Sequence, residues 1–174
     1  MRALVISDIH GIKSNLNIIK EKYTSLNCEK LIVLGDLYWK NKDSKDYDPK
    51  YVQKFLKDFS NNIICIKGNC DFNVNPINEP FPIHKDKVVN LTDNIYITHG
   101  NLYNETNWII ENSILIFGHY HTPFIKKIKN NLYINTGSIS TQRGLNKPTY
   151  LYINNCEFII YDIDNKVISS YKIK

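Results

Sequence analysis

The sequence predicts an α/β fold in which mixed β-sheets stack face to face and helices flank them. Three observations support this prediction. In the first half, short apolar runs alternate with amphipathic helical patterns, an order typical of parallel strands joined by crossover helices. The second half contains mostly short β-rich runs separated by turns. The length of 174 residues, against about 150 for an ordinary domain, indicates a single domain over residues 1–174.

Three apolar runs in the first half predict buried strands: residues 4–6, 31–34 and 63–66. Each run ends at a short polar or glycine-containing turn. A parallel strand that is covered on both faces requires such an unbroken apolar run. We therefore expect a parallel sheet built on these three strands.

Two amphipathic segments separate the three runs. The first begins after a candidate N-cap at Ser14, and the second begins at Asp48 and Pro49, an N-cap followed by a first-turn proline. Apolar residues recur at helical spacing in both segments: Leu16, Ile19 and Tyr23 in the first, and Val52, Phe55, Leu56 and Phe59 in the second. Both segments are predicted to form helices that pack on the sheet.

The second half is predicted to consist mainly of strands. Residues 88–91 and 95–98 flank Asp93 and Asn94, a pattern typical of a hairpin turn. Residues 113–117 form another apolar run and predict a buried strand. The last third is expected to form a meander of the β-rich runs 125–128, 132–134, 149–153, 158–162 and 167–173.

The composition of the chain argues against several classes of function. Lys and Arg number 22 against 17 Asp and Glu, but the lysines are scattered and Arg2 and Arg143 are the only arginines, so specific nucleic-acid binding is not expected. No apolar stretch approaches the ~20 residues of a membrane span, and no signal-peptide pattern occurs, which indicates a cytoplasmic protein. The cysteines form no CxxC pair, and Cys28, Cys65 and Cys156 are expected to pack in the core.

Side chains that bind metal ions gather at the ends of the predicted strands. Loops from several strands converge at one edge of an α/β sheet. Seven side chains stand there: Asp8, His10, Asp36, Asn69, His99, His119 and His121. Seven ligands are too many for one transition-metal ion and suit two ions that share a bridging carboxylate, a role that fits Asp36. Mixed oxygen and nitrogen ligands favour Mn, Fe, Zn or Ni over Mg or Ca.

The charge of such a site indicates its substrate. Two divalent ions, the carboxylates of Asp8 and Asp36 and a bridging hydroxide leave the site net positive, so it attracts an anion with several oxygens. A phosphate ester fits, because the ions polarise its oxygens and generate a metal-bridging hydroxide as nucleophile for in-line displacement. The sequence therefore predicts hydrolysis of a phosphoester bond.

The motifs together resemble a known family. Five blocks in this order are similar to the signature of the calcineurin-like metallophosphoesterase superfamily: Asp8-Ile9-His10, Gly35-Asp36, Gly68-Asn69-Cys70-Asp71, His99-Gly100 and Gly118-His119-Tyr120-His121. The small size, the opening Ser7-Asp8-Ile9-His10-Gly11 and the Asn-Cys-Asp variant resemble its small YfcE-type phosphodiesterase branch, which is related to the Vps29-like scaffolds.

The resemblance implies a four-layer α-β-β-α sandwich of two mixed sheets flanked by helices, the metallophosphoesterase fold. It also implies a dinuclear metal-dependent phosphoesterase that favours phosphodiesters, with cyclic nucleotides and dinucleotides among the candidate substrates. The two divalent ions are expected to be Mn, with Ni, Zn, Fe or Mg as alternatives. Members of this branch form dimers or higher oligomers, so a homo-oligomer is one expectation. The implied ligands are Asp8, His10 and His121 for the first ion and Asn69, His99 and His119 for the second, with Asp36 as the bridge.

Three further residues are candidate catalytic residues. Cys70 stands where most of the family has a histidine that assists the leaving group. Because a thiol is at best a weak donor, good leaving groups are expected to be favoured, and Cys70 itself either contributes to catalysis or is an inert buried thiol. Asp71 is expected to lie behind the ligands and to orient a metal-binding histidine. Arg143 is expected either to contact the substrate phosphate or to lie on the surface. Tyr38 and Trp39 either stack on an organic group of the substrate or pack in the core.

A second function class is a Vps29-like protein-interaction scaffold with residual metal binding. The sequence favours the enzyme, because a scaffold does not need the imidazoles of His10, His99, His119 and His121 in the geometry of a metal site. The specificity of such an enzyme is expected to depend on the loops that follow Asp36, Asp71 and His99.

Overall fold

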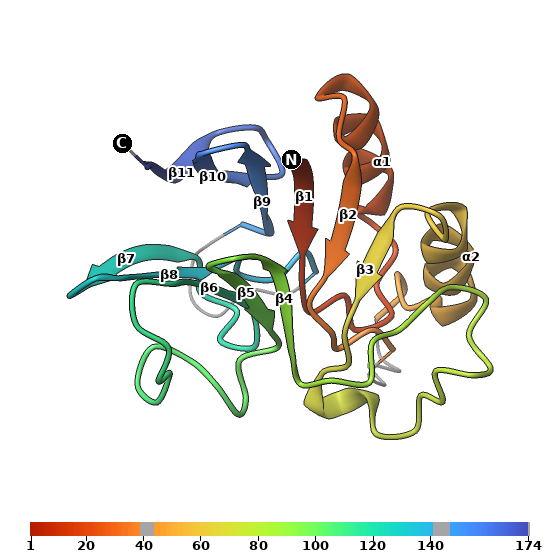
Figure 1. The fold of residues 1–174 in the computed structure, drawn as a ribbon. Helices are drawn as coiled ribbons and strands as arrows, with labels where there is room; N and C mark the ends of the chain where they lie inside the picture. The colour runs from red at the N-terminus through yellow and green to blue at the C-terminus, as the bar shows by residue number, and fades with distance from the viewer. Residues whose placement is uncertain (39–43, 141–146, 174) are drawn as a thin grey trace.

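The computed structural model describes residues 1–38, 44–140 and 147–173, and it contains two mixed sheets stacked face to face (Figure 1). The larger sheet comprises β1 (Arg2–Ile6), β2 (Lys30–Val33), β3 (Ile63–Cys65), β9 (Thr149–Asn154), β10 (Glu157–Asp162) and β11 (Val167–Lys172). Its strand order is β11-β10-β9-β1-β2-β3. β1, β2 and β3 run parallel as predicted, and β9 to β11 extend the sheet in antiparallel fashion.

The smaller sheet comprises β4 (Val88–Thr92), β5 (Ile95–Thr98), β6 (Ile114–Phe117), β7 (Phe124–Ile128) and β8 (Asn131–Asn135). Its strand order is β4-β5-β6-β8-β7. β4 and β5 form the predicted hairpin, whereas β5, β6 and β8 are parallel. The two sheets confirm the predicted fold class.

The prediction of one meander in the last third is wrong. β7 and β8 belong to the smaller sheet, and β9 to β11 belong to the larger one. The chain crosses between the sheets after β8, where Thr136 N donates to Phe117 O at 2.9 Å and Ile139 N donates to Ser7 O at 3.0 Å. An apolar run identifies a buried strand but not its neighbour, so β8 could not be assigned to a position beside β6 from its pattern.

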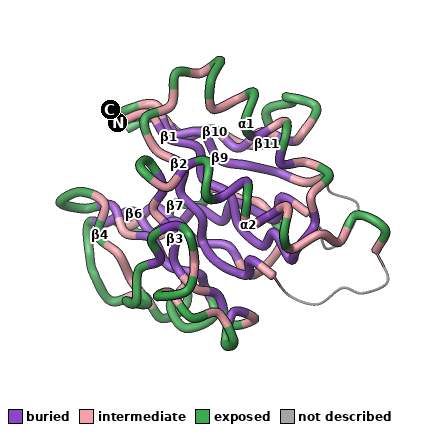
Figure 2. The backbone as a smooth tube through the Cα atoms, turned by 90° about the vertical axis from the view of Figure 1, so that its right-hand side faces the viewer, coloured by how far each residue is buried: buried purple, intermediate pink, exposed green. Residues whose placement is uncertain are grey.

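The core consists of hydrophobic clusters on both sides of each sheet. One cluster fills the space between the sheets and includes Val5, Ile116 and Leu151. A second lies between the larger sheet and the two helices, α1 (Leu16–Ser25) and α2 (Pro49–Asp58). On the outer face of the smaller sheet, Trp108 packs on a cluster that includes Phe117, and the covering segment 101–112 forms turns rather than a helix. Figure 2 shows the resulting buried centre and the exposed loops around it.

The predicted N-cap residue is correct for one of the two α-helices. α2 begins at Pro49, and the Asp48 carboxylate accepts a hydrogen bond from Tyr51 N at 3.0 Å. The prediction of Ser14 as the N-cap of α1 is wrong, because Asn15 occupies that position and Ser14 Oγ donates to Asp46 at 2.7 Å. No helix in the described ranges is long and apolar enough to cross a membrane.

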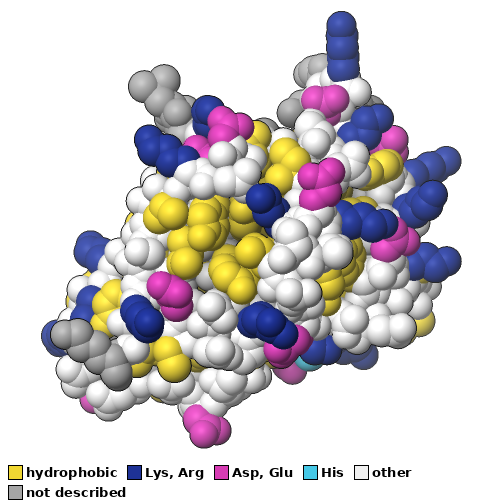
Figure 3. Space-filling model, turned by 90° about the horizontal axis from the view of Figure 1, so that it is seen from above, with side chains coloured by type: hydrophobic (Ala, Val, Ile, Leu, Met, Phe, Trp, Pro, Cys, Tyr) yellow, Lys and Arg dark blue, Asp and Glu magenta, His cyan; other side chains and the backbone are white. Residues whose placement is uncertain are grey.

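The loops that follow β1, β2 and β3 lie at the lower end of the molecule in Figure 1. The opposite end, seen in Figure 3, exposes hydrophobic side chains among interspersed basic and acidic ones. The predicted metal ligands follow the carboxyl ends of their strands, so the candidate site lies at the lower end.

Candidate metal centre

The loop after β1 is fixed to the loop after β2. Asp8 N donates to Gly35 O at 3.0 Å, and His10 N donates to Asp36 O at 2.8 Å. These bonds continue the parallel pairing of the two strands past their ends. Two predicted ligands from the first loop are thereby held beside a third from the second.

Five of the seven predicted ligands have a left-handed backbone. The φ angles are 56° for Asp8, 53° for His10, 56° for Asp36, 64° for His119 and 57° for His121. This region is uncommon for residues with a Cβ atom and costs free energy. Strained backbone of this kind gathers at functional sites, where the surrounding structure holds it in place. The loops therefore adopt the backbone conformations that place these five side chains in the site.

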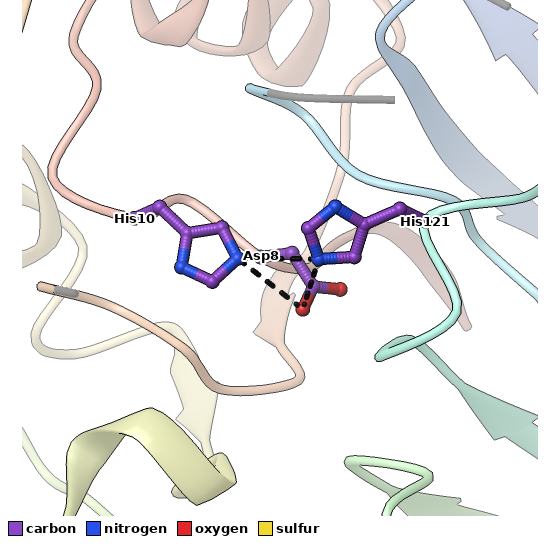
Figure 4. Close-up of side chains that lie close together, drawn as sticks. All are labelled: Asp8, His10 and His121. Atoms are coloured by element: carbon purple, nitrogen blue, oxygen red, sulfur yellow. Dashed lines mark hydrogen bonds and ion pairs between the residues drawn. The ribbon is translucent and has the colours of Figure 1, made fainter. Parts of the chain in front are cut away.

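The first group of ligands consists of Asp8, His10 and His121, which converge in Figure 4. Asp8 Oδ1 lies 3.2 Å from His121 Nε2 and 3.8 Å from His10 Nε2, and the two Nε2 atoms are 3.2 Å apart. Asp8 Oδ1 is buried and faces both imidazole nitrogens. Because a buried carboxylate oxygen is costly without a positively charged partner, the arrangement fits a cation held between the three side chains.

The second group consists of Asp36, His99 and His119, with Asn69 beside them. His99 Nδ1 donates to Leu34 O at 2.7 Å, so a neutral His99 has a lone pair on Nε2. This Nε2 lies 3.0 Å from Asn69 Oδ1 and 3.5 Å from Asp36 Oδ1. Three acceptor atoms that face one another fit a shared cation, and a backbone carbonyl that fixes the tautomer is typical of a metal-binding histidine.

Asp36 faces both groups with different oxygens. Its Oδ2 lies 3.9 Å from His10 Nε2, and its Oδ1 lies 3.5 Å from His99 Nε2. Cys70 N donates to Oδ1 at 2.8 Å and fixes the carboxylate. This placement fits the predicted bridging role.

The electrostatics of the site favour a positive charge between the carboxylates. Burial raises the pKa of Asp36, but hydrogen bonding with His99 outweighs burial, so this pKa is lowered. Burial also raises the pKa of Asp8, but His121 and the charge of His99 outweigh it, so this pKa is lowered too. Burial lowers the pKa of His99, yet the contact with Asp36 and the charge of Asp8 outweigh it, and the pKa of His99 is raised. Burial also lowers the pKa of His10, which favours its neutral, metal-binding form.

The expectation that Asp71 orients a histidine is wrong. Its buried carboxylate instead accepts three backbone N–H groups: those of Asp36 at 2.7 Å, Leu37 at 2.8 Å and Gly68 at 2.9 Å. The turns after β2 and β3 approach so closely that their amides meet at this point. Asp71 therefore fixes the two turns that carry Asp36 and Asn69, while Leu34 O orients His99.

Replacing Asp71 with asparagine is expected to lower the free energy of unfolding by about 1–3 kcal/mol and to weaken metal binding. The amide keeps only one acceptor oxygen and turns an NH₂ group toward backbone donors. Thermal denaturation and calorimetric metal titration measure the two effects. Asp162→Asn is the matched control, because Asp162 Oδ1 accepts Asp164 N at 3.0 Å and Lys166 N at 2.9 Å in a turn of the larger sheet. The control should lose stability but not metal affinity, and equal losses of affinity would contradict the assignment.

The remaining predicted residues have different environments. Burial, followed by the neighbouring Asp36 and Asp71, raises the pKa of the Cys70 thiol to about 12, so Cys70 is an uncharged thiol at neutral pH. The half-buried Tyr38 packs on the core beneath the helices and donates to Glu79 at 3.0 Å. Arg143 and Trp39 lie outside the described residues.

Of the three cysteines expected in the core, Cys65 is buried, Cys28 is half-buried and Cys156 is exposed. The expectation for Cys156 is wrong because it lies in the tight turn between β9 and β10, where the side chain faces solvent.

Three residues at the end of β8 and directly after it support the site and were missed by the sequence-based prediction. Asn135 Nδ2 donates to Gly118 O at 2.6 Å and so fixes the turn before His119. Ser138 Oγ and Ser140 Oγ donate to Asp8 O at 2.9 Å and 2.7 Å. The available signal was a run of small polar residues directly after an apolar strand, which indicates a loop that bonds to its neighbours.

Comparison with known proteins identifies the family. Residues 1–157 match the family model of the calcineurin-like phosphoesterase superfamily domain. The chain is 28% identical over 162 residues to the phosphodiesterase YfcE of Escherichia coli K12, a match that covers 89% of this chain and 88% of that protein.

Solved structures agree with this match. A structure of the E. coli phosphoesterase Yfce superposes with a TM-score of 0.89 at 27% identity and covers 100% of both chains. Vacuolar protein sorting 29 from Cryptosporidium parvum superposes with a TM-score of 0.59 at 21% identity over 99% of this chain and 98% of that chain, a likeness of fold. The chain therefore belongs to the calcineurin-like phosphoesterase superfamily.

Proposed function

We propose that this chain is a metal-dependent phosphodiesterase that hydrolyses small phosphoesters at the centre formed by the two ligand groups. The observation that carries the proposal is the Asp36 carboxylate, whose two oxygens face two separate groups of ligands. Membership of a phosphoesterase family and the similarity to a phosphodiesterase support it. We further propose that residues 1–174 act as one domain in the cytoplasm, where the four free cysteines stay reduced.

The proposed ligand sets are those that the family resemblance implies. Asp8, His10 and His121 would hold one divalent ion, and Asn69, His99 and His119 a second, with Asp36 shared between them. This set of carboxylate, amide and imidazole ligands suits Mn, and also Ni, Zn or Fe, better than Ca. Divalent ions held here would act as Lewis acids on the phosphoryl oxygens and would activate water.

Three properties of the protein side chains bear on the reaction. Asp71 and the glycine turns fix Asp36 before substrate arrives, so little reorganisation is required. His10 stays neutral because it is buried. The Cys70 thiol, whose pKa is about 12, is a poor proton donor to an alkoxide, so we expect esters with good leaving groups to react best.

Hydrolysis of a chromogenic phosphodiester and the matching monoester tests the proposal. Metal-stripped protein receives Mn, Ni, Zn or Mg singly, and the initial rate is measured for each ester. Metal-dependent turnover with the diester preferred supports a phosphodiesterase. Preference for the monoester would change the substrate class, and absence of turnover despite calorimetric metal binding would refute the enzyme and favour the protein-interaction scaffold.

Replacing Cys70 with alanine is expected to change kcat/KM for a p-nitrophenyl diester by less than about threefold. A nitrophenolate leaves without a proton, and the thiol has little tendency to give one up. Steady-state kinetics of the p-nitrophenyl diester beside an alkyl diester measure the effect. A loss of about 10² or more that is confined to the alkyl diester would show that Cys70 acts as a general acid.

Small nucleotide-like diesters are the proposed substrates, and a homo-oligomer is the proposed assembly. Specific nucleic-acid binding is not proposed, since the positive charge of the chain is spread over single lysines. Size-exclusion chromatography with light scattering determines the assembly state, and a mass of 20.4 kDa would identify a monomer.

A further inference from the structure

Two loops that start at the metal centre carry large apolar side chains in solvent. Phe72 is 75% exposed and Leu102 is 48% exposed. Phe72 follows Asn69 by three residues, Leu102 follows His99 by three residues, and His99 Nε2 lies 3.0 Å from Asn69 Oδ1. Because three residues of chain reach at most about 11 Å, both loop positions stay close to the second ligand group. In Figure 1 the loop after β5 lies at the lower left of β1 to β3, and the turn before Phe72 lies below β3.

The loop that carries Leu102 is held in one shape by side-chain hydrogen bonds. Asn104 N donates to Asn107 Oδ1 at 2.9 Å, and Asn107 Nδ2 donates to Leu102 O at 2.7 Å. The neighbouring Tyr103, 39% exposed, lies edge-on to Trp108 with ring centroids 6.2 Å apart. A loop fixed in this way presents Leu102 and Tyr103 to solvent at a defined place.

The loop that carries Phe72 is fixed as well. Phe72 ends the short 3₁₀ turn η1 (Asn69–Asp71). Asp71 anchors that turn through Gly68 N at 2.9 Å, and Val74 N donates to Asp71 O at 3.0 Å. An exposed apolar residue alone requires no explanation, but here such residues stand on two fixed loops that both begin at the metal centre.

We propose that Phe72, Leu102 and Tyr103 form an apolar rim that binds the non-reacting ester group of a phosphodiester. This inference rests on the proposed function. In the hydrolysis of a diester, one ester group leaves and the other stays on the phosphate. When the phosphate lies at the metal centre, the ester group that stays reaches the loops that surround the centre. An aromatic group gains most from such a contact, since rings pack on Phe, Tyr and Leu side chains. The preferred substrate class is therefore a diester whose second group is an aryl group or a nucleoside.

Three diesters with the same p-nitrophenolate leaving group test the rim. Their second ester group is methyl, phenyl or 5′-linked thymidine, and kcat/KM is measured on the metal-loaded full chain. Phe72→Ala and Leu102→Ala should each lower kcat/KM for the phenyl and thymidine esters about five- to tenfold. The methyl ester should change by less than about twofold, because it makes no ring contact. Equal changes for the three esters, or no change, would overturn the rim.

Ile109→Ala is the matched control. Ile109 is 86% exposed on the same segment as Leu102, but it lines a depression with Ile128 and Lys129 beside the turn between β7 and β8. This control should leave the preference among the three esters unchanged, and a shift as large as that of Leu102→Ala would overturn the proposal. Circular dichroism of each variant verifies that the fold is intact.

A binding measurement separates this inference from the proposed function. If the wild-type chain hydrolyses none of the three esters, the proposed function fails, and calorimetry with phenylphosphonate and methylphosphonate on the metal-loaded chain tests the rim by itself. Weaker binding of phenylphosphonate alone in Phe72→Ala supports the rim. Equal affinities for the two ligands, or no binding of either, would overturn it.

Discussion

Replacing Asp36 with alanine is expected to lower kcat/KM for a chromogenic phosphodiester by about 10³-fold or more. The two oxygens of Asp36 face the two ligand groups, at 3.9 Å from His10 Nε2 and 3.5 Å from His99 Nε2. Its loss removes a negative charge that both ions would share and leaves His99 without its carboxylate partner. Steady-state kinetics and metal analysis of the purified variant measure the activity and the metal content.

Asp58→Ala is the control for this substitution. It also removes an aspartate, but this one is half-exposed and forms an ion pair with Lys20 at 2.9 Å on the surface. A surface ion pair contributes little to stability, so Asp58→Ala should retain activity and metal. Unchanged turnover in Asp36→Ala, with the fold intact by circular dichroism, would refute the ligand assignment. Lost turnover with the full metal content would instead make Asp36 a group that acts on the substrate.

The fold was predictable where one residue pattern has one structural meaning. The run from Leu31 to Leu34 is short, apolar at every position and followed by Gly35, which is typical of a strand covered on both faces, so β2 could be placed between helices and a second sheet. The Asp48-Pro49 pair likewise has one common meaning, and it begins α2. The partner of β8 was not predictable, because burial of Leu132 and Ile134 is equally satisfied in either sheet.

The candidate site was predictable in its residue types but not in its geometry. Aspartate and histidine side chains at successive strand ends indicate a metal centre, because the strand ends converge. No sequence pattern reports that Asp8 and His10 take left-handed backbone conformations, since these depend on the loop after β2 that bonds to them. The role of Asp71 was missed for a related reason. Its carboxylate bonds to backbone N–H groups, which every residue except proline carries and which leave no trace in the sequence.

Asp36 closely approaches the turn after β3 at Gly68, which leaves no room for a side chain at that residue. Replacing Gly68 with alanine is expected to lower the free energy of unfolding by about 3 kcal/mol or more and to abolish most of the phosphodiesterase activity. A Cβ atom at this position would lie 2.0 Å from Asp36 Oδ1 and 2.4 Å from Asp36 N. Contacts this short are not tolerated, and the second one is to backbone that Asp71 holds at 2.7 Å, so the carboxylate must move. Thermal denaturation, metal titration and diester kinetics measure the three consequences.

Lys67→Ala, in the adjacent residue, distinguishes this steric effect from a general fragility of the turn. Lys67 Nζ donates to Val74 O at 2.7 Å, and loss of that bond should cost about 1 kcal/mol without displacing Asp36. Lys67→Ala is therefore expected to bind metal and to hydrolyse the diester as the wild-type chain does. Wild-type stability and metal affinity in Gly68→Ala would mean that the turns after β2 and β3 can separate while the site remains assembled. In that case the close packing of the two turns would not be what positions Asp36, and the anchoring of Asp36 by Asp71 and Cys70 would suffice alone.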